Sequence, residues 1–162
     1  MEKPTVAGWP GDMTELLAGI AIKNLTRLLP IDVSAFSSAQ PTSRQFAQLA
    51  ERGVATVINL RPQSEMVDLD EAALVGELGM GYVQIPIANE TDLTIVNARS
   101  FALVLENNPA PFLIHCAGGN RVGALFALKA FMLDGYTAEQ ALELGLQAGL
   151  TGLHDAVAAV MK

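Results

Sequence analysis

Short β-branched apolar runs alternate along this chain with longer segments whose apolar residues recur at helical spacing. Short runs bounded by glycine, proline or polar residues predict strands, and apolar positions three and four apart predict helices. The predicted strands are 33–38, at a sheet edge, followed by 54–60, 82–87 and 111–115. The predicted helices are 12–29, 42–52, 64–78, 93–107, 121–134, 137–148 and 151–161.

Strands that alternate with helices predict the α/β class, because a parallel connection crosses back over the sheet through a helix. We expect a three-layer α/β/α arrangement with a mostly parallel central sheet of four to five strands. Residues 1–11 contain two prolines and two glycines and predict an irregular arm. No repeat or linker divides residues 12–162, which we expect to form a single domain.

Composition narrows the choice of partners. The 162 residues include 17 acidic and 10 basic side chains, for a formal net charge of −7, which argues against nucleic-acid binding. One cysteine excludes an internal disulfide. The apolar segment 16–22 is too short to span a bilayer and lacks a preceding basic region. We therefore expect no membrane association and a cytoplasmic protein, or a periplasmic one if a signal peptide has been removed.

The most informative motif is the segment His115–Arg121, which follows an apolar strand and precedes an apolar helix. Such a strand–loop–helix places backbone N–H groups and the positive helix end around an anion. Glycines let the backbone approach closely, and Arg121 offers two donors to one tetrahedral oxyanion. The candidate phosphate-binding residues are Ala117, Gly118, Gly119, Asn120 and Arg121. The same field favours the thiolate form of Cys116, which makes Cys116 a candidate nucleophile.

Other polar residues follow neighbouring predicted strands. Arg61 comes after the strand 54–60, and Glu90 and Asp92 come after 82–87. The carboxyl ends of parallel strands share one sheet edge, so we expect these residues to gather near Cys116. Arg61 suits a substrate contact and an anchor for Glu65 equally well. Asp92 or Thr94 also suits the cap of the following helix.

Three stretches together resemble the cysteine-based phosphatases of the dual-specificity type, and in particular a bacterial group associated with beta-lactamase-hydrolase-like proteins. They are Ser37–Thr42, Val57–Pro62 with Glu65, and His115–Gly123. The resemblance implies a dual-specificity-phosphatase-like fold and hydrolysis of a phosphoester by Cys116 through a phosphocysteine. It implies that Arg121 and the loop amides hold the phosphoryl group, that His115 supports the thiol, and that Glu90 or Asp92 protonates the leaving oxygen.

Two departures from this family pattern keep alternatives open. Four residues separate Cys116 from Arg121, where the family signature has five, and Val122 replaces a hydroxyl residue. The shorter loop is also the rhodanese pattern, which predicts sulfur transfer. A third interpretation is a catalytically weak phosphate-binding pseudophosphatase. The expected partner is a phosphorylated small molecule or a phosphoprotein.

Three further points concern metal binding, one acidic cluster and the oligomeric state. The sequence contains no cluster with metal-ligand spacing, so we expect no metal and no other cofactor. Asp68, Asp70 and Glu71 are expected to form a solvated helix face. The oligomeric state has no signal in the sequence.

Overall fold

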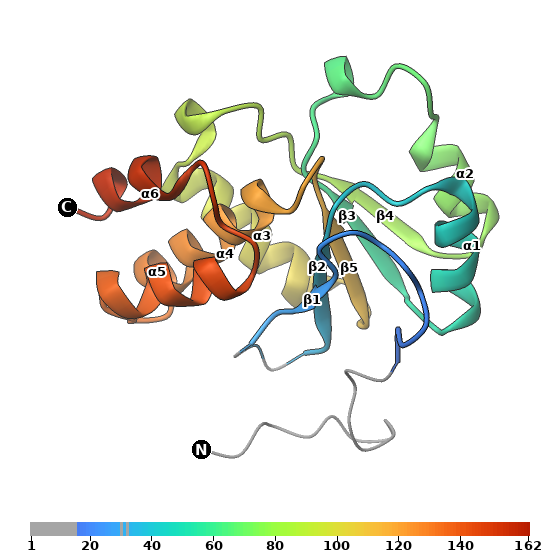
Figure 1. Cartoon of the computed structure of the whole chain (residues 1–162), viewed down its shortest axis with the longest axis horizontal. Helices are drawn as coiled ribbons and strands as arrows, with labels where there is room; N and C mark the ends of the chain where they lie inside the picture. Colours follow the sequence, from blue (N-terminus) through green and yellow to red (C-terminus); the bar gives the residue numbers. More distant parts are fainter. Residues whose placement is uncertain (1–15, 30, 32) are drawn as a thin grey trace.

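The computed structural model describes residues 16–29, 31 and 33–162, and its centre is a sheet of five strands within those residues. The strands are β1 (Thr26–Arg27), β2 (Ala35–Ser38), β3 (Thr56–Asn59), β4 (Gly81–Gln84) and β5 (Phe112–His115). Their order is β1-β2-β5-β3-β4 (Figure 1). β2, β5, β3 and β4 are parallel and only β1 is antiparallel, which confirms the predicted mostly parallel sheet.

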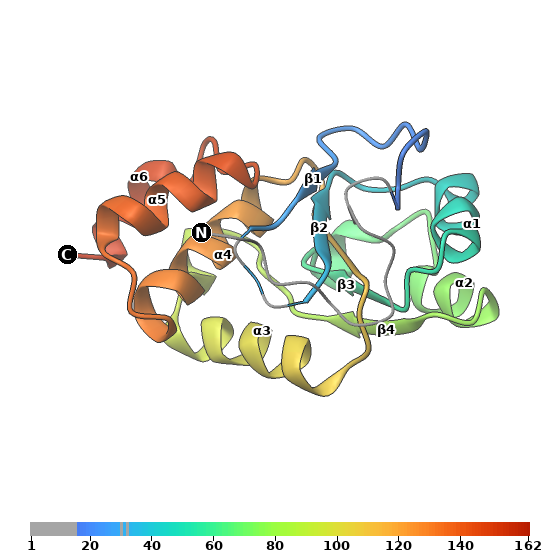
Figure 2. The same cartoon turned by 90° about the horizontal axis from the view of Figure 1, so that it is seen from below.

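Helices cover both faces of the sheet (Figures 1 and 2). One face carries α1 (Ser43–Glu51) and α2 (Glu71–Glu77). The opposite face carries α3 (Ile95–Asn107) and α4 (Asn120–Leu133), with α5 (Ala138–Gln147) and α6 (His154–Val160) packed outside α4. Two short 3-10 helices, η2 (Gln63–Glu65) and η3 (Glu90–Asp92), follow β3 and β4. The three-layer prediction is confirmed.

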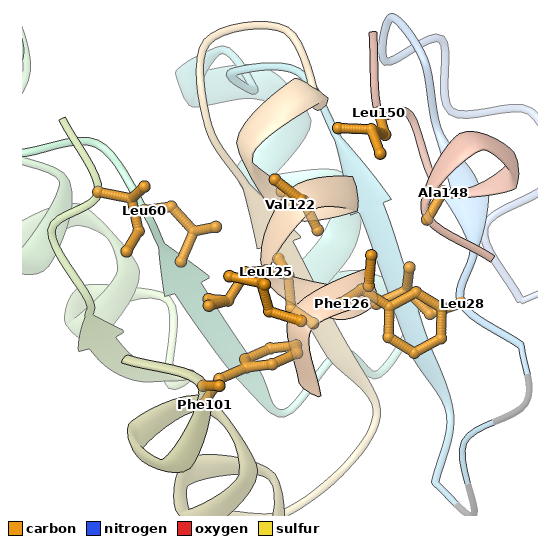
Figure 3. Packing of buried hydrophobic residues seen from close by; sticks show 14 of the residues in the cluster. Leu28, Leu60, Phe101, Val122, Leu125, Phe126, Ala148 and Leu150 are labelled. Carbon is orange, nitrogen blue, oxygen red and sulfur yellow. The ribbon is translucent and has the colours of Figure 1, made fainter. Parts of the chain in front are cut away.

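The central strand β5 is buried on both sides, as the apolar run Phe112–Ile114 requires. Phe112 and Ile114 join the cluster formed with α3 and α4 (Figure 3), whereas Leu113 joins the cluster with α1 and α2. Alternate residues of β5 thus pack into the hydrophobic clusters on opposite faces of the sheet. Because β5 is the central strand, Cys116, which directly follows it, lies in the middle of the edge formed by the carboxyl ends of the parallel strands.

The predicted helix over 12–29 is wrong for its described part, residues 16–29. These residues form turns and β1, with Gly19 and Asn24 both at positive φ. Two of their carbonyls bond to the residue that caps α1 instead of to a helical turn: Arg52 Nη1 donates to the carbonyls of Leu16 and Ala18. Leu17, Ile20 and Ile22 still lie buried. The apolar spacing indicated burial, but it did not determine a helix.

Two other predicted elements differ from the structure. The segment 64–78 divides into η2 and α2, because the Asp70 side chain caps α2 by accepting from the Ala73 amide. The strand at 33–38 forms as β2, but β1 pairs with its outer side, so it is not an edge strand. The predicted arm at 1–11 lies outside the described residues. In the part of the chain that is described, no helix combines the length and the apolar character needed to cross a membrane.

The start of α4 is held by an unusually close crossing with the C-terminal region. A Cβ on Gly123 would lie 2.3 Å from the Leu150 amide nitrogen and 2.7 Å from the Gly145 carbonyl oxygen. Only a glycine allows the two backbones to approach this closely. The crossing sets the position of α4, whose first turn contains Arg121.

Candidate active site

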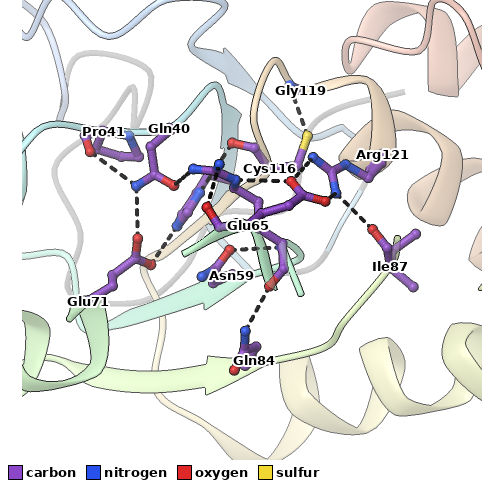
Figure 4. Close-up of polar contacts among 12 residues, drawn as sticks. Gln40, Pro41, Asn59, Glu65, Glu71, Gln84, Ile87, Cys116, Gly119 and Arg121 are labelled. Carbon is purple, nitrogen blue, oxygen red and sulfur yellow. Dashed lines mark hydrogen bonds and ion pairs between the residues drawn. The ribbon is translucent and has the colours of Figure 1, made fainter. Parts of the chain in front are cut away.

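Cys116 directly follows β5 and is 1% exposed, at the base of the segment 116–121, which we call the cysteine loop. Gly119 has φ +97°, a conformation that favours glycine, and it is the N-cap of α4. This turn brings the Gly119 amide back over the sulfur, to which it donates at 3.0 Å (Figure 4). The loop therefore stabilises negative charge on Sγ by a backbone hydrogen bond.

The cysteine loop is braced through its carbonyl groups. The backbone N–H of Gln40 donates to the Ala117 carbonyl at 3.2 Å, and the side-chain Nδ2 of Asn24 donates to the Gly118 carbonyl at 2.8 Å. By contrast, the amides of Ala117, Gly118, Asn120 and Arg121 donate to no acceptor in the described part of the chain. Carbonyls bonded to the scaffold and amides left available are what an anion cradle needs.

Arg121 is held from one side only. Its Nη1 and Nη2 atoms donate to the two carboxylate oxygens of Glu65, both at 2.8 Å, and Nη1 also donates to the Ile87 carbonyl at 2.9 Å. The hydrogen bond with Glu65 raises the pKa of Arg121, and the contact with the nearby Cys116 sulfur acts in the same direction. Nε and the second hydrogen of Nη2 form the opposite fork of the guanidinium. This fork meets no oxygen acceptor in the described part of the chain, where the other group beside the guanidinium is the Cys116 sulfur, so it is free for an oxyanion.

Glu65 owes its position to Arg61. The Nε of Arg61 donates to Oε1 of Glu65 at 3.2 Å, and its Nη2 donates to the Glu65 carbonyl at 3.0 Å. Hydrogen bonds from Arg121, followed by those from Arg61, hold the pKa of Glu65 below its usual value. Of the two roles expected for Arg61, the structure shows the anchor for Glu65.

His115 and Glu71 form a buried pair beneath the loop. His115 is 0% and Glu71 2% exposed, and Nε2 lies 2.6 Å from Oε2 of Glu71. The expectation that Glu71 belongs to a solvated face is therefore wrong, and Asp70 serves as the helix cap. The signal was present in the spacing: Glu71 stands four residues before the buried Val75, on the inner face of α2.

The two candidate acids occupy η3, on the loop that begins directly after Ile87. Oδ2 of Asp92 accepts from the Ala88 amide at 2.8 Å, so this carboxylate shapes the loop. Glu90 is exposed, and its carboxylate accepts no hydrogen bond from the described residues. Thr94, the alternative to Asp92 as helix cap, accepts from the Asn97 amide and caps α3.

The side chain of Asn120 turns away from the predicted cradle. Its Oδ1 accepts from the Thr151 amide at 2.8 Å and from the Leu153 amide at 3.3 Å. Only the backbone of Asn120 therefore remains for a phosphate. Gln40 and Asn24, which both hold the loop, were not expected at this site, since neutral amides carry no titration or spacing signal. Gln40 entered only as part of the stretch Ser37–Thr42.

Val122, at the position of the family's hydroxyl residue, is fully buried in the core around α4. The Val122 side chain therefore cannot donate a hydrogen bond to the Cys116 sulfur. Among the residues that the structure describes, no group of three or more His, Cys, Asp or Glu side chains gathers in a way that could hold a metal ion.

Comparisons with curated proteins identify bacterial relatives. The chain is 29% identical over 113 residues to a beta-lactamase hydrolase-like protein of Xylella fastidiosa strain 9a5c, covering 67% of this chain and 26% of the relative. It is 31% identical over 102 residues to the protein of that name from Agrobacterium fabrum, covering 60% and 23%. The chain thus spans about a quarter of the length of these relatives.

Solved structures share the fold. The DUF442 protein of Shewanella putrefaciens CN-32 is 25% identical with a TM-score of 0.66, over 93% of this chain and 96% of the other. TpbA of P. aeruginosa, a cysteine-to-serine variant in complex with phosphotyrosine, is 21% identical with a TM-score of 0.58, over 96% and 90%. The family model described as the DSP-PTPase phosphatase domain of the Swiss Army Knife protein matches residues 23–157. The chain therefore belongs to this PTP-SAK family of phosphatase domains.

Proposed function

We propose that this protein hydrolyses phosphate monoesters through a covalent intermediate on Cys116. The observation that carries the proposal is the shared environment of two side chains. The Cys116 sulfur accepts from the Gly119 amide, and the Arg121 guanidinium beside it has one fork held by Glu65 and the other free. A phosphoryl group placed above the sulfur would meet this free fork and the available loop amides.

The reaction follows from this arrangement in two steps. The Cys116 thiolate attacks phosphorus, the S–P bond forms, and the bond from phosphorus to the ester oxygen breaks as that oxygen takes a proton. Water then attacks the phosphocysteine, which releases inorganic phosphate and regenerates the thiolate. Arg121 and the amides stabilise the charge on the transferring phosphoryl oxygens in both steps, with no change in their own protonation.

We assign the proton donor for the leaving oxygen to Glu90. Asp92 already accepts the Ala88 amide, and its loss would change the shape of the loop. The Glu90 carboxyl has no such role and lies two residues away on the same exposed turn. A general acid must be able to reach the substrate, so the unengaged side chain is the better candidate.

Val122 affects the second step. A hydroxyl near the sulfur would assist its departure as a leaving group, and Val122 has none. We therefore expect the phosphocysteine to hydrolyse slowly and to accumulate, so that product release shows a rapid first turnover followed by a slower steady state.

The test is release of nitrophenolate from p-nitrophenyl phosphate in the presence of EDTA. We expect turnover by the wild type, none by Cys116→Ser, and inhibition by vanadate. The third interpretation, a binding protein, requires phosphate binding that is lost in Arg121→Ala without any turnover by the wild type. Sulfur transfer requires that Cys116 gain the mass of one sulfur atom after incubation with thiosulfate. Either result, in place of turnover, would contradict the proposed function.

The substrate class is a phosphorylated small molecule or a phosphoprotein, as proposed from the motif. TpbA has been solved with phosphotyrosine, and this chain has the same fold. A panel that contains phosphotyrosine, phosphoserine and small alkyl phosphates, scored by release of phosphate, separates the two substrate classes.

A further inference from the structure

A chain of side-chain hydrogen bonds connects the two ends of the cysteine loop through residues distant in sequence (Figure 4). It starts at His115, which precedes Cys116, and passes to Glu71 at 2.6 Å. It ends at Arg121, held by Glu65, which Arg61 holds in turn. Among the described residues, Gln40 alone connects Glu71 and Arg61 by side-chain hydrogen bonds; it follows β2.

The amide of Gln40 fits this place in one orientation. Its Nε2 donates to Oε1 of Glu71 at 2.8 Å and to the Pro41 carbonyl at 3.1 Å. Its Oε1 accepts from Nη1 of Arg61 at 2.8 Å. A flipped amide would set an oxygen against the Glu71 carboxylate and an NH₂ group against the guanidinium. Both contacts would be repulsive, so the two charged neighbours determine the orientation.

The position of Arg61 depends on this acceptor. Two of its three hydrogen bonds from the guanidinium go to Glu65, and the third goes to Gln40. Without Gln40, Nη1 of Arg61 loses its only hydrogen-bond partner among the described residues, and the guanidinium can rotate about the contacts to Glu65. Glu65 lies in a single 3-10 turn and is one-third exposed, so its own backbone gives it little support.

We propose that Gln40 is a positioning residue for the reaction, which acts through Arg61 and Glu65 to keep the free fork of Arg121 directed at the phosphoryl site above Cys116. The proposal rests on the proposed function only in taking that site as the place of the phosphoryl group. The Gln40 side chain makes no hydrogen bond to Cys116. Its other hydrogen bond leads through Glu71 to His115, beside Cys116, so the test needs a readout that reports the position of Arg121 separately from the reactivity of the sulfur.

The test compares Gln40→Met with Gln45→Met. Methionine has nearly the length of glutamine and forms none of the three hydrogen bonds. Gln45 lies on α1 and also makes side-chain hydrogen bonds, to the Thr42 amide and the Ala21 carbonyl, but it does not contact Arg61 or Glu71. It is therefore a matched control for the loss of a bonded amide.

The main readout is alkylation of Cys116 and needs no turnover. Iodoacetate carries a carboxylate that the free fork of Arg121 attracts, whereas iodoacetamide is neutral, so the ratio of the two rates reports the position of Arg121. We expect Gln40→Met to lower this ratio about tenfold, the effect of one lost hydrogen bond to a charged group. Gln45→Met should leave it unchanged. An unchanged ratio in folded Gln40→Met overturns the proposal, whether or not the wild type hydrolyses phosphoesters.

Three further measurements complete the test. Gln40→Asn keeps the amide but shortens its reach by one methylene, so it should also lower the ratio, and it replaces Gln40→Met if that variant does not fold. Because Gln40 acts through Arg61, Arg61→Met should lower the ratio and adding Gln40→Met should lower it no further. Fully additive effects would contradict the proposed route. If turnover is detected, kcat should fall more than KM rises.

Discussion

Glu65 binds Arg121 through both carboxylate oxygens, each 2.8 Å from a guanidinium nitrogen. These residues stand 56 positions apart, on η2 and at the start of α4. A bidentate pair fixes the plane of the guanidinium as well as its place. The carboxylate therefore does not compete with a phosphoryl group for Arg121, because it occupies the fork that faces away from the free donors.

This relationship predicts the effect of Glu65→Gln. The amide can accept from only one of the two Arg121 nitrogens, so the guanidinium loses its fixed plane. We expect kcat/KM for p-nitrophenyl phosphate to fall about 10²-fold, a typical loss for a misplaced donor to a developing oxyanion. Glu77→Gln, at an exposed carboxylate on α2, is the control and should retain wild-type activity. Equal activity of the two variants would show that Glu65 does not position Arg121.

The pH dependence of stability follows from the same pair. The pKa of Glu65 in the folded protein is lowered from 4.5, chiefly by the hydrogen bond from Arg121. A lowered folded-state pKa contributes stability that is fully present above about pH 4.5 and is lost as pH falls through the lowered value. The difference in unfolding free energy between wild type and Glu65→Gln should therefore be constant near neutrality and shrink in acid. Urea titrations between about pH 3 and 7 measure it. A difference that grows in acid would contradict the sign.

The assignment of the acid predicts a dependence on the leaving group. Glu90→Gln should lower kcat for alkyl phosphates about 10²-fold, because an alkoxide must be protonated as it leaves. Hydrolysis of p-nitrophenyl phosphate should change little, since nitrophenolate is stable without a proton. Asp92→Asn retains an oxygen that can accept the Ala88 amide and should show no such difference between substrates. The reverse pattern would move the role to Asp92.

The close crossing of α4 and the C-terminal region predicts opposite effects on stability for alanine at two glycines. Gly123→Ala would place a Cβ 2.3 Å from the Leu150 nitrogen, so the backbones must separate. We expect a loss of about 3 kcal/mol or more of unfolding free energy. Gly76→Ala, on α2, meets nothing within 4 Å and should stabilise by about 0.5–1 kcal/mol through helix propensity. Denaturant unfolding compares them, and similar values for both would exclude the close packing.

The sequence predicted the centre of the molecule because its signals there are local. The unbroken apolar run of β5 needs burial on both faces, and the glycines and Arg121 that follow need an anion. The hydrophobic and polar pattern gave wrong predictions where contacts with residues distant in sequence determine the local structure. Residues 16–29 have helical spacing, but Arg52 takes the carbonyls of Leu16 and Ala18. Glu71 has an acidic neighbour in sequence and was expected in solvent, yet His115 and Gln40 both meet its carboxylate.

The residues of the candidate site divide in the same way. Cys116, Arg121 and the loop glycines stand within six positions, so their combination is visible in one motif. Gln40 follows β2, whereas Arg61 and Glu65 both follow β3, and the parallel order of β2, β5 and β3 brings these strand ends together. The motif wrongly predicted the side chain of Asn120 as a phosphate ligand, because its oxygen accepts hydrogen bonds from the backbone amides of residues 151 and 153.

The contact between Asn120 and the turn around Thr151 has a consequence for protein engineering. The first residue of α4 depends on a segment thirty-one positions further along the chain. A deletion that removed α5, α6 and this turn would retain every residue of the cysteine motif and still release the helix that carries Arg121. Anyone who transplants this cysteine loop and its helix into another polypeptide must therefore move the C-terminal helices with them.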